Sequence, residues 1–142
     1  MPDYAKIYFH NRYEVVIASD TIFPFSLQHF NDDPFFDRPF GIVTAFNPYN
    51  KTLSIQENLL RNRLLYSELN SKFELLEAKG CLNEHCEEGY LIYDITLSEL
   101  IKIGRSYEQF AIFYNTTTKL EYIECKSKKV IVEKERKAPK SR

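Results

Sequence analysis

The alternation of hydrophobic and polar residues predicts a chain of short strands and two longer helices. Apolar runs rich in β-branched or aromatic residues predict strands at residues 12–19, 40–46, 73–81, 89–95, 110–115 and 119–126. Apolar residues spaced by three or four, each set preceded by a Ser or Thr cap, predict helices at residues 55–71 and 97–107. We therefore expect a fold of the α+β class.

From Phe40 onward the predicted order is strand, helix, strand, strand, helix, strand. This is the order of the ferredoxin-like, or split βαβ, plan, in which two main helices cover one face of an antiparallel sheet. One extra N-terminal strand, residues 12–19, precedes this core, and another strand, residues 119–126, follows it. The nearly continuous apolar run at residues 40–46 leaves an alternative open, a mixed sheet with helices on both faces.

Residues 20–39 interrupt the pattern and are predicted to be irregular. Three of the six prolines lie here, and proline fixes φ and removes a backbone donor. The part of the chain before residue 51, which includes this region, contains twelve of the 21 Phe and Tyr residues. A long loop of this kind either contributes to function or forms an aromatic flap that covers one face of the core.

The helix predicted at residues 55–71 carries polar side chains on the face that is expected to be buried. At about 100° per residue, Asn58 and Asn62 lie inside its apolar arc and Arg61 borders the arc. Arg61 also follows Glu57 by four residues, a favourable order for an ion pair on a helix. A buried amide without a partner costs about 1–3 kcal/mol, so both asparagines must form hydrogen bonds. The arc itself consists of Ile55, Leu59, Leu65, Tyr66 and Leu69.

Two interpretations of these polar residues remain open. In the structural one, Asn58 and Asn62 bind the backbone near the turn at Asn47-Pro48, and Arg61 pairs with a carboxylate. In the functional one, the amides line a small pocket in which Arg61 holds a phosphate or carboxylate by two hydrogen bonds. The candidate ligand-binding residues are Asn47, Glu57, Asn58, Arg61, Asn62 and Glu88.

Leu60 and Leu64 lie on the opposite side of the same helix. They either pack beneath the aromatic flap or form part of a dimer face, so the protein is expected to be a monomer or a homodimer.

Charge divides the chain into two parts. Residues 126–142 contain eight basic and two acidic residues, whereas the rest of the chain contains 11 basic and 18 acidic ones. We therefore expect a single acidic domain at residues 1–125 and a flexible basic tail at residues 126–142. A basic tail favours a weak contact with nucleic acid through its phosphates. No apolar run of membrane-spanning length occurs, so no membrane contact is expected.

The three cysteines, an odd number, suit a reducing compartment in which thiols need not pair. The chain also begins without a basic segment followed by an apolar one, and we expect a cytoplasmic protein. Cys81, His85 and Cys86 lie within six residues but lack the two spaced ligand pairs that are typical of structural zinc sites. We therefore predict no metal and no cofactor.

No motif in the sequence identifies a reaction, since glycine-rich phosphate loops and the common hydrolase motifs are missing. The first hypothesis is a small binding or regulatory domain for a small anionic ligand or an acidic peptide. The second is an enzyme that acts on a phosphorylated or nucleotide-like molecule, with Arg61 holding the anion and Glu57 or Glu88 as base. The third is an interaction module that contacts RNA or a protein partner through its basic tail.

Three segments of the chain carry a recognisable pattern: Thr44-Ala45-Phe46-Asn47-Pro48, the spaced set Ser54, Glu57, Asn58, Arg61, Asn62 and Leu65, and Glu88-Gly89-Tyr90. In these segments the sequence resembles a bacterial family named domain of unknown function 3293. The resemblance covers about residues 12–124 and leaves the basic tail outside. It implies a bacterial cytoplasmic protein and assigns no activity.

Overall fold

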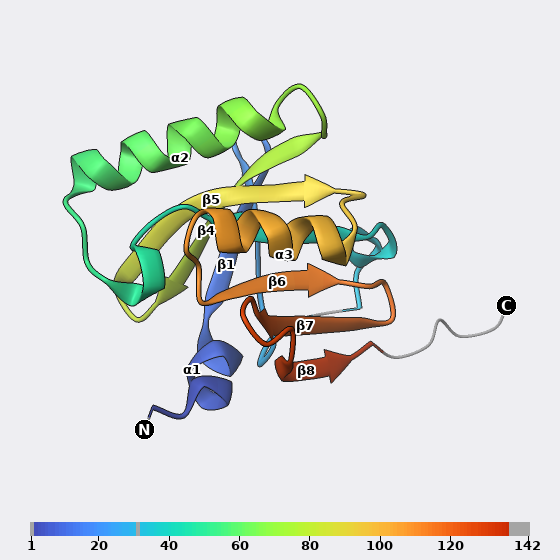
Figure 1. The fold of residues 1–142 in the computed structure, drawn as a ribbon. Helices are drawn as coiled ribbons and strands as arrows, with labels where there is room; N and C mark the ends of the chain where they lie inside the picture. The colour runs from blue at the N-terminus through green and yellow to red at the C-terminus, as the bar shows by residue number, and fades with distance from the viewer. Residues whose placement is uncertain (1, 31, 137–142) are drawn as a thin grey trace, which may run out of the picture.

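A computed structural model describes residues 2–30 and 32–136 (Figure 1). Its helices are α1 (Tyr4–His10), α2 (Ile55–Leu69) and α3 (Leu97–Ser106), with 3-10 turns at Pro34–Asp37 and Pro48–Asn50. The strands are β1 (Arg12–Ala18), β2 (Thr21–Ser26), β3 (Phe40–Thr44), β4 (Leu75–Leu82), β5 (His85–Tyr93), β6 (Ala111–Asn115), β7 (Lys119–Glu124) and β8 (Val130–Glu135). Within the described residues, all strands join one antiparallel sheet in the order β2-β1-β4-β5-β3-β6-β7-β8. The predicted α+β class is confirmed.

The curled sheet has a different core on each face. On one face, which we call the helical face, α3 packs on β3 and β6 and α2 lies along β5 (Figure 1). The core of the helical face is aliphatic and includes Val43, Leu65, Ile92, Leu100 and Ile112. The opposite face, which we call the aromatic face, buries a cluster of rings that includes Tyr13, Phe25, Phe36, Phe40, Phe113 and Tyr122. Hydrophobic packing on both faces stabilises the sheet.

Residues 20–39 are more regular than the sequence predicts. Thr21–Ser26 form β2, which lies at the edge of the sheet, where a proline such as Pro24 is tolerated. Phe25 and Phe36 are buried in the core of the aromatic face, and Phe23 packs against them. The predicted flap is therefore partly a strand, and its rings belong to the core.

The described residues form three helices, whereas the sequence predicts two. The additional helix, α1, has seven residues, and Asp3 caps it by accepting a hydrogen bond from the backbone N of Lys6. Tyr8 and Phe9 of α1 pack against the aromatic core. A helix of two turns is too short to show a clear period in its sequence.

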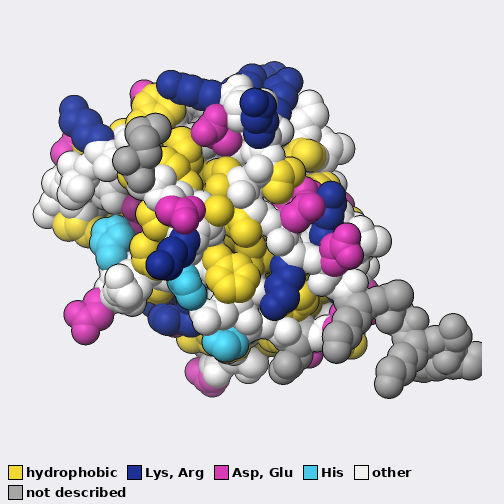
Figure 2. Space-filling view, turned by 90° about the horizontal axis from the view of Figure 1, so that it is seen from below, with side chains coloured by type: hydrophobic (Ala, Val, Ile, Leu, Met, Phe, Trp, Pro, Cys, Tyr) yellow, Lys and Arg dark blue, Asp and Glu magenta, His cyan; other side chains and the backbone are white. Residues whose placement is uncertain are grey.

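The surface seen from below, the side on which α1 lies, shows hydrophobic side chains bordered by charged ones (Figure 2).

The buried face of α2 also differs from the predicted arc. Leu65 and Leu69 are buried, but Ile55, Leu59 and Tyr66 are exposed. The helix touches the sheet along one narrow stripe, which consists of Asn58, Asn62, Leu65 and Leu69. Leu60 and Leu64 are exposed rather than packed beneath the residues of the predicted flap.

Part of the segment predicted as a basic tail, residues 126–142, forms a strand in the structure. Strand β8 pairs with β7, and its Ile131 and Val132 pack against the aromatic core. The side chain of Arg136 is almost fully buried, because it donates to the carbonyls of Phe36 and Thr117 and pairs with two aspartates. Residues 130–136 therefore pair and pack with the rest of the fold, and residues 137–142 lie outside the described part of the chain.

The longest described helix, α2, has 15 residues, and no helix in the described ranges is long and apolar enough to cross a membrane.

Candidate functional site

The β4–β5 hairpin carries acidic residues to both faces of the sheet. Its register leaves Asn83 and Glu84 in the turn, so the segment between the strands predicted at residues 73–81 and 89–95 is mostly strand. Side chains alternate along a strand. The side chain of Glu87 therefore lies on the aromatic face, and that of the neighbouring Glu88 lies on the helical face. These two carboxylates belong to different sites although they are adjacent in the sequence.

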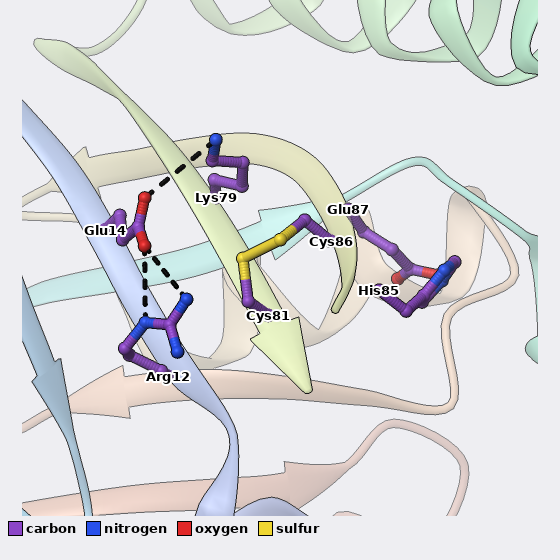
Figure 3. The surroundings of a disulfide bond; sticks show 7 residues. All are labelled: Arg12, Glu14, Lys79, Cys81, His85, Cys86 and Glu87. Atoms are coloured by element: carbon purple, nitrogen blue, oxygen red, sulfur yellow. Dashed lines mark hydrogen bonds and ion pairs between the residues drawn. A yellow bond between two sulfur atoms is a disulfide. The ribbon is translucent and has the colours of Figure 1, made fainter. Parts of the chain in front are cut away.

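A disulfide joins Cys81 and Cys86, with an S–S distance of 2.10 Å. The two residues are direct partners in the β4–β5 register, and their Cα atoms are 4.1 Å apart. The prediction of unpaired thiols is therefore wrong for these two cysteines, because the hairpin places them opposite each other. Cys125 is free and buried, and its burial raises the pKa of the thiol to about 11. Figure 3 shows the disulfide near Arg12, Glu14 and Lys79, with His85 and Glu87 further along the hairpin.

Asn47 and Asn58 form a closed hydrogen-bond cluster that joins the Asn47-Pro48 turn to the first turns of α2. The backbone N of Asn47 donates to Asn58 Oδ1 at 2.8 Å, and Asn58 Nδ2 donates to Asn47 Oδ1 at 2.8 Å. Asn47 Oδ1 also accepts from the backbone N of Leu53, while Asn47 Nδ2 donates to Glu87 Oε2 at 2.7 Å. Asn47 has a φ of 48°, a left-handed conformation that asparagine tolerates. Both amides are satisfied within the protein.

Arg61 is bound to the backbone. Its Nε donates to the carbonyl of Ala45 at 2.6 Å, and its Nη2 donates to the carbonyl of Tyr107. Its Nη1 lies 3.8 Å from a carboxylate oxygen of Glu108. The guanidinium therefore ties α2 to the end of β3 and to the residue after α3, whereas the structural interpretation of the sequence predicts a carboxylate as its partner.

The other predicted site residues do not join this cluster. Glu57 completes a capping box with Ser54, whose hydroxyl accepts from the backbone N of Glu57. Glu88 is exposed on the helical face. Asn62 is buried, but its Oδ1 forms no hydrogen bond with any described residue. The structure thus brings together Asn47, Asn58 and Glu87, while Glu57, Asn62 and Glu88 lie apart from them.

A pocket of about 100 Å³ opens on the aromatic face, and we call it the tyrosine pocket. The phenol side chains of Tyr8, Tyr13 and Tyr122 line it together with Glu87 and Gln109. No lysine or arginine is among its lining residues in the described part of the chain. A cavity of this size holds several water molecules or one small ligand.

The phenols of the tyrosine pocket are neutral at physiological pH. Burial is the main cause that raises the pKa of Tyr8, Tyr13 and Tyr122 above the ordinary value for tyrosine. The negative charge of Glu87 raises the pKa of Tyr8 and Tyr13 further. The pocket therefore contains neutral hydroxyl groups beside one carboxylate, and the Tyr122 hydroxyl already accepts a hydrogen bond from Asn11 Nδ2 at 3.0 Å.

Two acceptors of the tyrosine pocket are held in place by other groups. Gln109 is 6% exposed, and its Nε2 donates to the carbonyls of Phe46 and Tyr107 at 2.9 and 3.1 Å. Its Oε1 is therefore the atom that it offers to the pocket. Glu87 is held through the hydrogen bond from Asn47. The cluster around the Asn47-Pro48 turn thus positions one wall of the pocket.

Most residues of the tyrosine pocket carry no signal in the sequence. Tyr8, Tyr13 and Tyr122 come from α1, β1 and β7, which are far apart in the sequence. No local spacing connects them. Glu87 could have been found from the alternation of strand β5, if the strand had been predicted to begin at His85.

Among the described residues, no group of three or more His, Cys, Asp or Glu side chains is placed to hold a metal ion.

The fold and its sites define an α+β protein with one antiparallel sheet and a phenol-lined pocket. Residues 43–112 match the model of a family described as "Protein of unknown function (DUF3293)". The family model that matches this part of the chain is the one that the three sequence segments predict. The match includes Asn47, Asn58, Arg61, Glu87 and Gln109 but not the three pocket tyrosines. No curated protein and no solved structure matches the chain.

Proposed function

We propose that the protein is a small-molecule binding domain whose site is the tyrosine pocket. The observation that carries the proposal is the lining of the pocket, which combines three neutral phenols and one carboxylate with no basic side chain. Ligand sites in proteins are typically apolar cavities with a few placed polar groups. The ligand is an uncharged or cationic molecule that donates hydrogen bonds to Glu87 and to Gln109 Oε1 and packs against the aromatic rings.

This proposal keeps the binding or regulatory domain expected from the sequence and changes its ligand. An anion in the tyrosine pocket would face the carboxylate of Glu87 without a cation to balance it. Arg61, the residue expected to hold an anion, is bound to the carbonyls of Ala45 and Tyr107. The enzyme hypothesis depends on the same guanidinium, and no contact in the structure favours it.

In this proposal, Asn47, Asn58 and Arg61 are positioning residues. Asn47 Nδ2 holds the carboxylate of Glu87, and Asn58 holds Asn47 by two hydrogen bonds. Arg61 fixes Ala45, at the end of β3 and two residues before Asn47. The spaced polar residues of the family pattern therefore support the pocket without touching the ligand.

A thermal-shift screen with matched compounds tests the proposal. One set contains small amines, amides and polyols, and the other contains phosphates and carboxylates of similar size. A ligand from the first set, present at ten times its Kd, is expected to raise Tm by about 5 °C. Stabilisation by the anionic set alone would contradict the proposal.

Two variants and one control connect any stabilisation to the tyrosine pocket. Tyr13→Phe removes one hydroxyl and keeps the ring, and Glu87→Gln removes the charge while keeping an oxygen that can accept from Asn47. Both are expected to reduce the thermal shift. For a neutral amide or polyol, Glu88→Gln, which changes the adjacent carboxylate on the other face, is expected to leave the shift unchanged.

We also propose that β3, β4, β5 and β6 follow the ferredoxin-like plan. Helix α2 connects β3 to β4, and β5 lies between these two strands and pairs with both. Helix α3 connects β5 to β6, and β3 lies between them. These two interleaved units support a split βαβ core that β1, β2, β7 and β8 extend on either side.

A further inference from the structure

A second pocket, of about 210 Å³, lies on the helical face, and we call it the outer pocket. One wall is α2, which contributes Asn62, and the floor consists of β4 and β5. Strands β1 and β2 complete it with Val16 and Ile22. The outer pocket is separate from the tyrosine pocket, because its acidic and aromatic residues are on the opposite face of the sheet. Its polar lining consists of Glu14, Asn62, Glu77, Lys79, Glu88 and Tyr90.

Asn62 lines the outer pocket and carries an acceptor that the described residues do not satisfy. Its side chain is 7% exposed, and its Oδ1 is buried without a hydrogen-bond partner in the described part of the chain. Among the side-chain nitrogen and oxygen atoms of the described residues, this is the one buried atom in that state. Buried polar atoms normally have partners, so an unpaired acceptor in a pocket wall points to a donor supplied by a ligand.

The charges around the outer pocket select a cationic donor. Three carboxylates line the pocket, whereas only one lysine ammonium group, that of Lys79, is among the lining residues of the described part of the chain. Glu14 is already paired with Arg12 at 3.0 Å and with Lys79 at 3.9 Å. Glu77 and Glu88 form no ion pair within the described ranges, so their negative charges are available to a ligand.

Tyr90 adds an aromatic surface to the same pocket. Burial, followed by the charge of Glu77, raises the pKa of Tyr90, so its ring stays neutral at physiological pH. The face of a neutral phenol ring attracts an organic cation. Val16 and Ile22 offer apolar contacts on the β1–β2 side of the pocket.

We propose that the outer pocket binds an organic ammonium ion, an alkyl chain that ends in an –NH3+ group. One N–H of the ammonium donates to Asn62 Oδ1, and the positive charge lies near Glu77 and Glu88. The alkyl chain contacts Val16 and Ile22. The ammonium ion belongs either to a free small amine or to a lysine side chain of a peptide, and both sources present the same group to the pocket.

A titration followed by NMR tests this proposal. Uniformly 15N-labelled protein is titrated with n-butylamine, with Nα-acetyl-lysine amide and, as a neutral probe, with n-butanol. Both ammonium compounds are expected to shift the Asn62 side-chain amide signals and the backbone signals of Glu77 and Glu88, and n-butanol is not. Equal affinities for n-butylamine and Nα-acetyl-lysine amide would identify a free small amine as a sufficient source of the ammonium ion. Tighter binding of the lysine amide would identify the lysine side chain of a peptide as the source.

Substitutions then assign the shifts to the outer pocket. Asn62→Leu removes the acceptor with little change in side-chain volume. It is expected to raise the Kd for n-butylamine at least about fivefold. The double variant Glu77→Gln with Glu88→Gln changes exposed residues, so it keeps the fold, and is expected to weaken binding by a similar factor. Glu68→Gln, on the same helix but outside the pocket, serves as the matched control and is expected to change nothing.

Three results would overturn the proposal. The first is the absence of amine-dependent shifts at Asn62, and the second is an equal response to n-butanol. The third is amine binding that the double variant leaves unchanged. Glu87→Gln removes a charge from the tyrosine pocket and is expected to leave amine binding to the outer pocket intact, so the two proposed sites fail or succeed independently.

Discussion

Asn58 and Asn62 lie one turn apart on α2 and are almost equally buried, with 4% and 7% exposure, but their hydrogen bonding is opposite. Asn58 forms two hydrogen bonds with Asn47, whereas Asn62 Oδ1 has no partner among the described residues. The first asparagine belongs to a closed cluster beside the tyrosine pocket, and the second lies in the wall of the outer pocket. Similar residues at similar depth therefore have different roles, and hydrogen-bond satisfaction distinguishes them.

Glu87 and Glu88 repeat this contrast on the neighbouring strand. Glu87 accepts a hydrogen bond from Asn47 on the aromatic face, and Glu88 is exposed in the outer pocket on the helical face. The two faces thus differ in how their polar groups are held. Substitutions in the closed cluster are expected to affect folding, whereas substitutions in the outer pocket are expected to affect ligand binding.

The largest effect is expected for Asn47→Asp in the closed cluster. The substitution replaces the Nδ2 donor, 2.7 Å from Glu87 Oε2, with a carboxylate oxygen. We expect the free energy of unfolding to fall by about 3 kcal/mol at pH 7, because a partly buried hydrogen bond becomes a repulsion between like charges. Urea unfolding monitored by circular dichroism measures this change.

Two further measurements sharpen the Asn47→Asp prediction. The two close carboxylates bind a proton more readily in the folded state than in the unfolded state, so the stability deficit should shrink as the pH falls towards 4. A second substitution, Glu87→Gln, should restore most of the lost stability at pH 7, because the glutamine can donate where Asn47 did. A deficit that is independent of pH would contradict the contact between Asn47 and Glu87.

A smaller effect is expected when the Cys81–Cys86 disulfide is removed. The bond closes a short loop, with a sequence separation of 5 residues, and supports the hairpin that places Glu87 and Glu88 on opposite faces. Chain-entropy arguments give a loss of about 2 kcal/mol for such a loop. Urea unfolding of the wild type with and without reductant measures the loss. The double variant Cys81→Ser with Cys86→Ser should show no response to reductant.

The smallest effect concerns the tyrosines at high pH. Tyr13 has a raised pKa in the folded state, so its contribution to stability is complete below pH 10 and is lost as the pH rises above 10. Tyr13→Phe should therefore reduce the decline of unfolding free energy between pH 10 and 11.5 by up to about 1.4 kcal/mol per pH unit. Tyr90→Phe, on the more exposed outer pocket, should reduce it less. Equal slopes for the two variants would show that the faces do not differ in burial.

The sequence predicted most of the strands and both of the longer helices, because these elements have strong local signals. The capping box of Ser54 and Glu57 placed the start of α2 correctly. The apolar runs of the sequence correctly predict strands β1, β3 and β6. Strand β2 was missed because Pro24 normally argues against a strand, and its position at the sheet edge is a tertiary property.

The candidate site was less predictable than the fold. The sequence indicated correctly that Asn58 needs a partner near Asn47, because buried amides are costly. It did not reveal that Arg61 is bound by carbonyls from two distant segments or that three tyrosines from separate elements line one pocket. These contacts join residues that are far apart in the sequence, so neither the local spacing of residues nor the hydrophobic periodicity predicts them.

The contrast between Asn58 and Asn62 is tested most directly by measuring the unfolding free energies of Asn58→Ala and Asn62→Ala under identical conditions. Asn58→Ala should lose about 2–3 kcal/mol, because it removes two buried hydrogen bonds and leaves the backbone N of Asn47 unpaired. Asn62→Ala should lose less than about 1 kcal/mol, because its buried oxygen has no partner to lose among the described residues. Equal losses for the two variants would contradict the assignment of Asn58 to the closed cluster and of Asn62 to an open site.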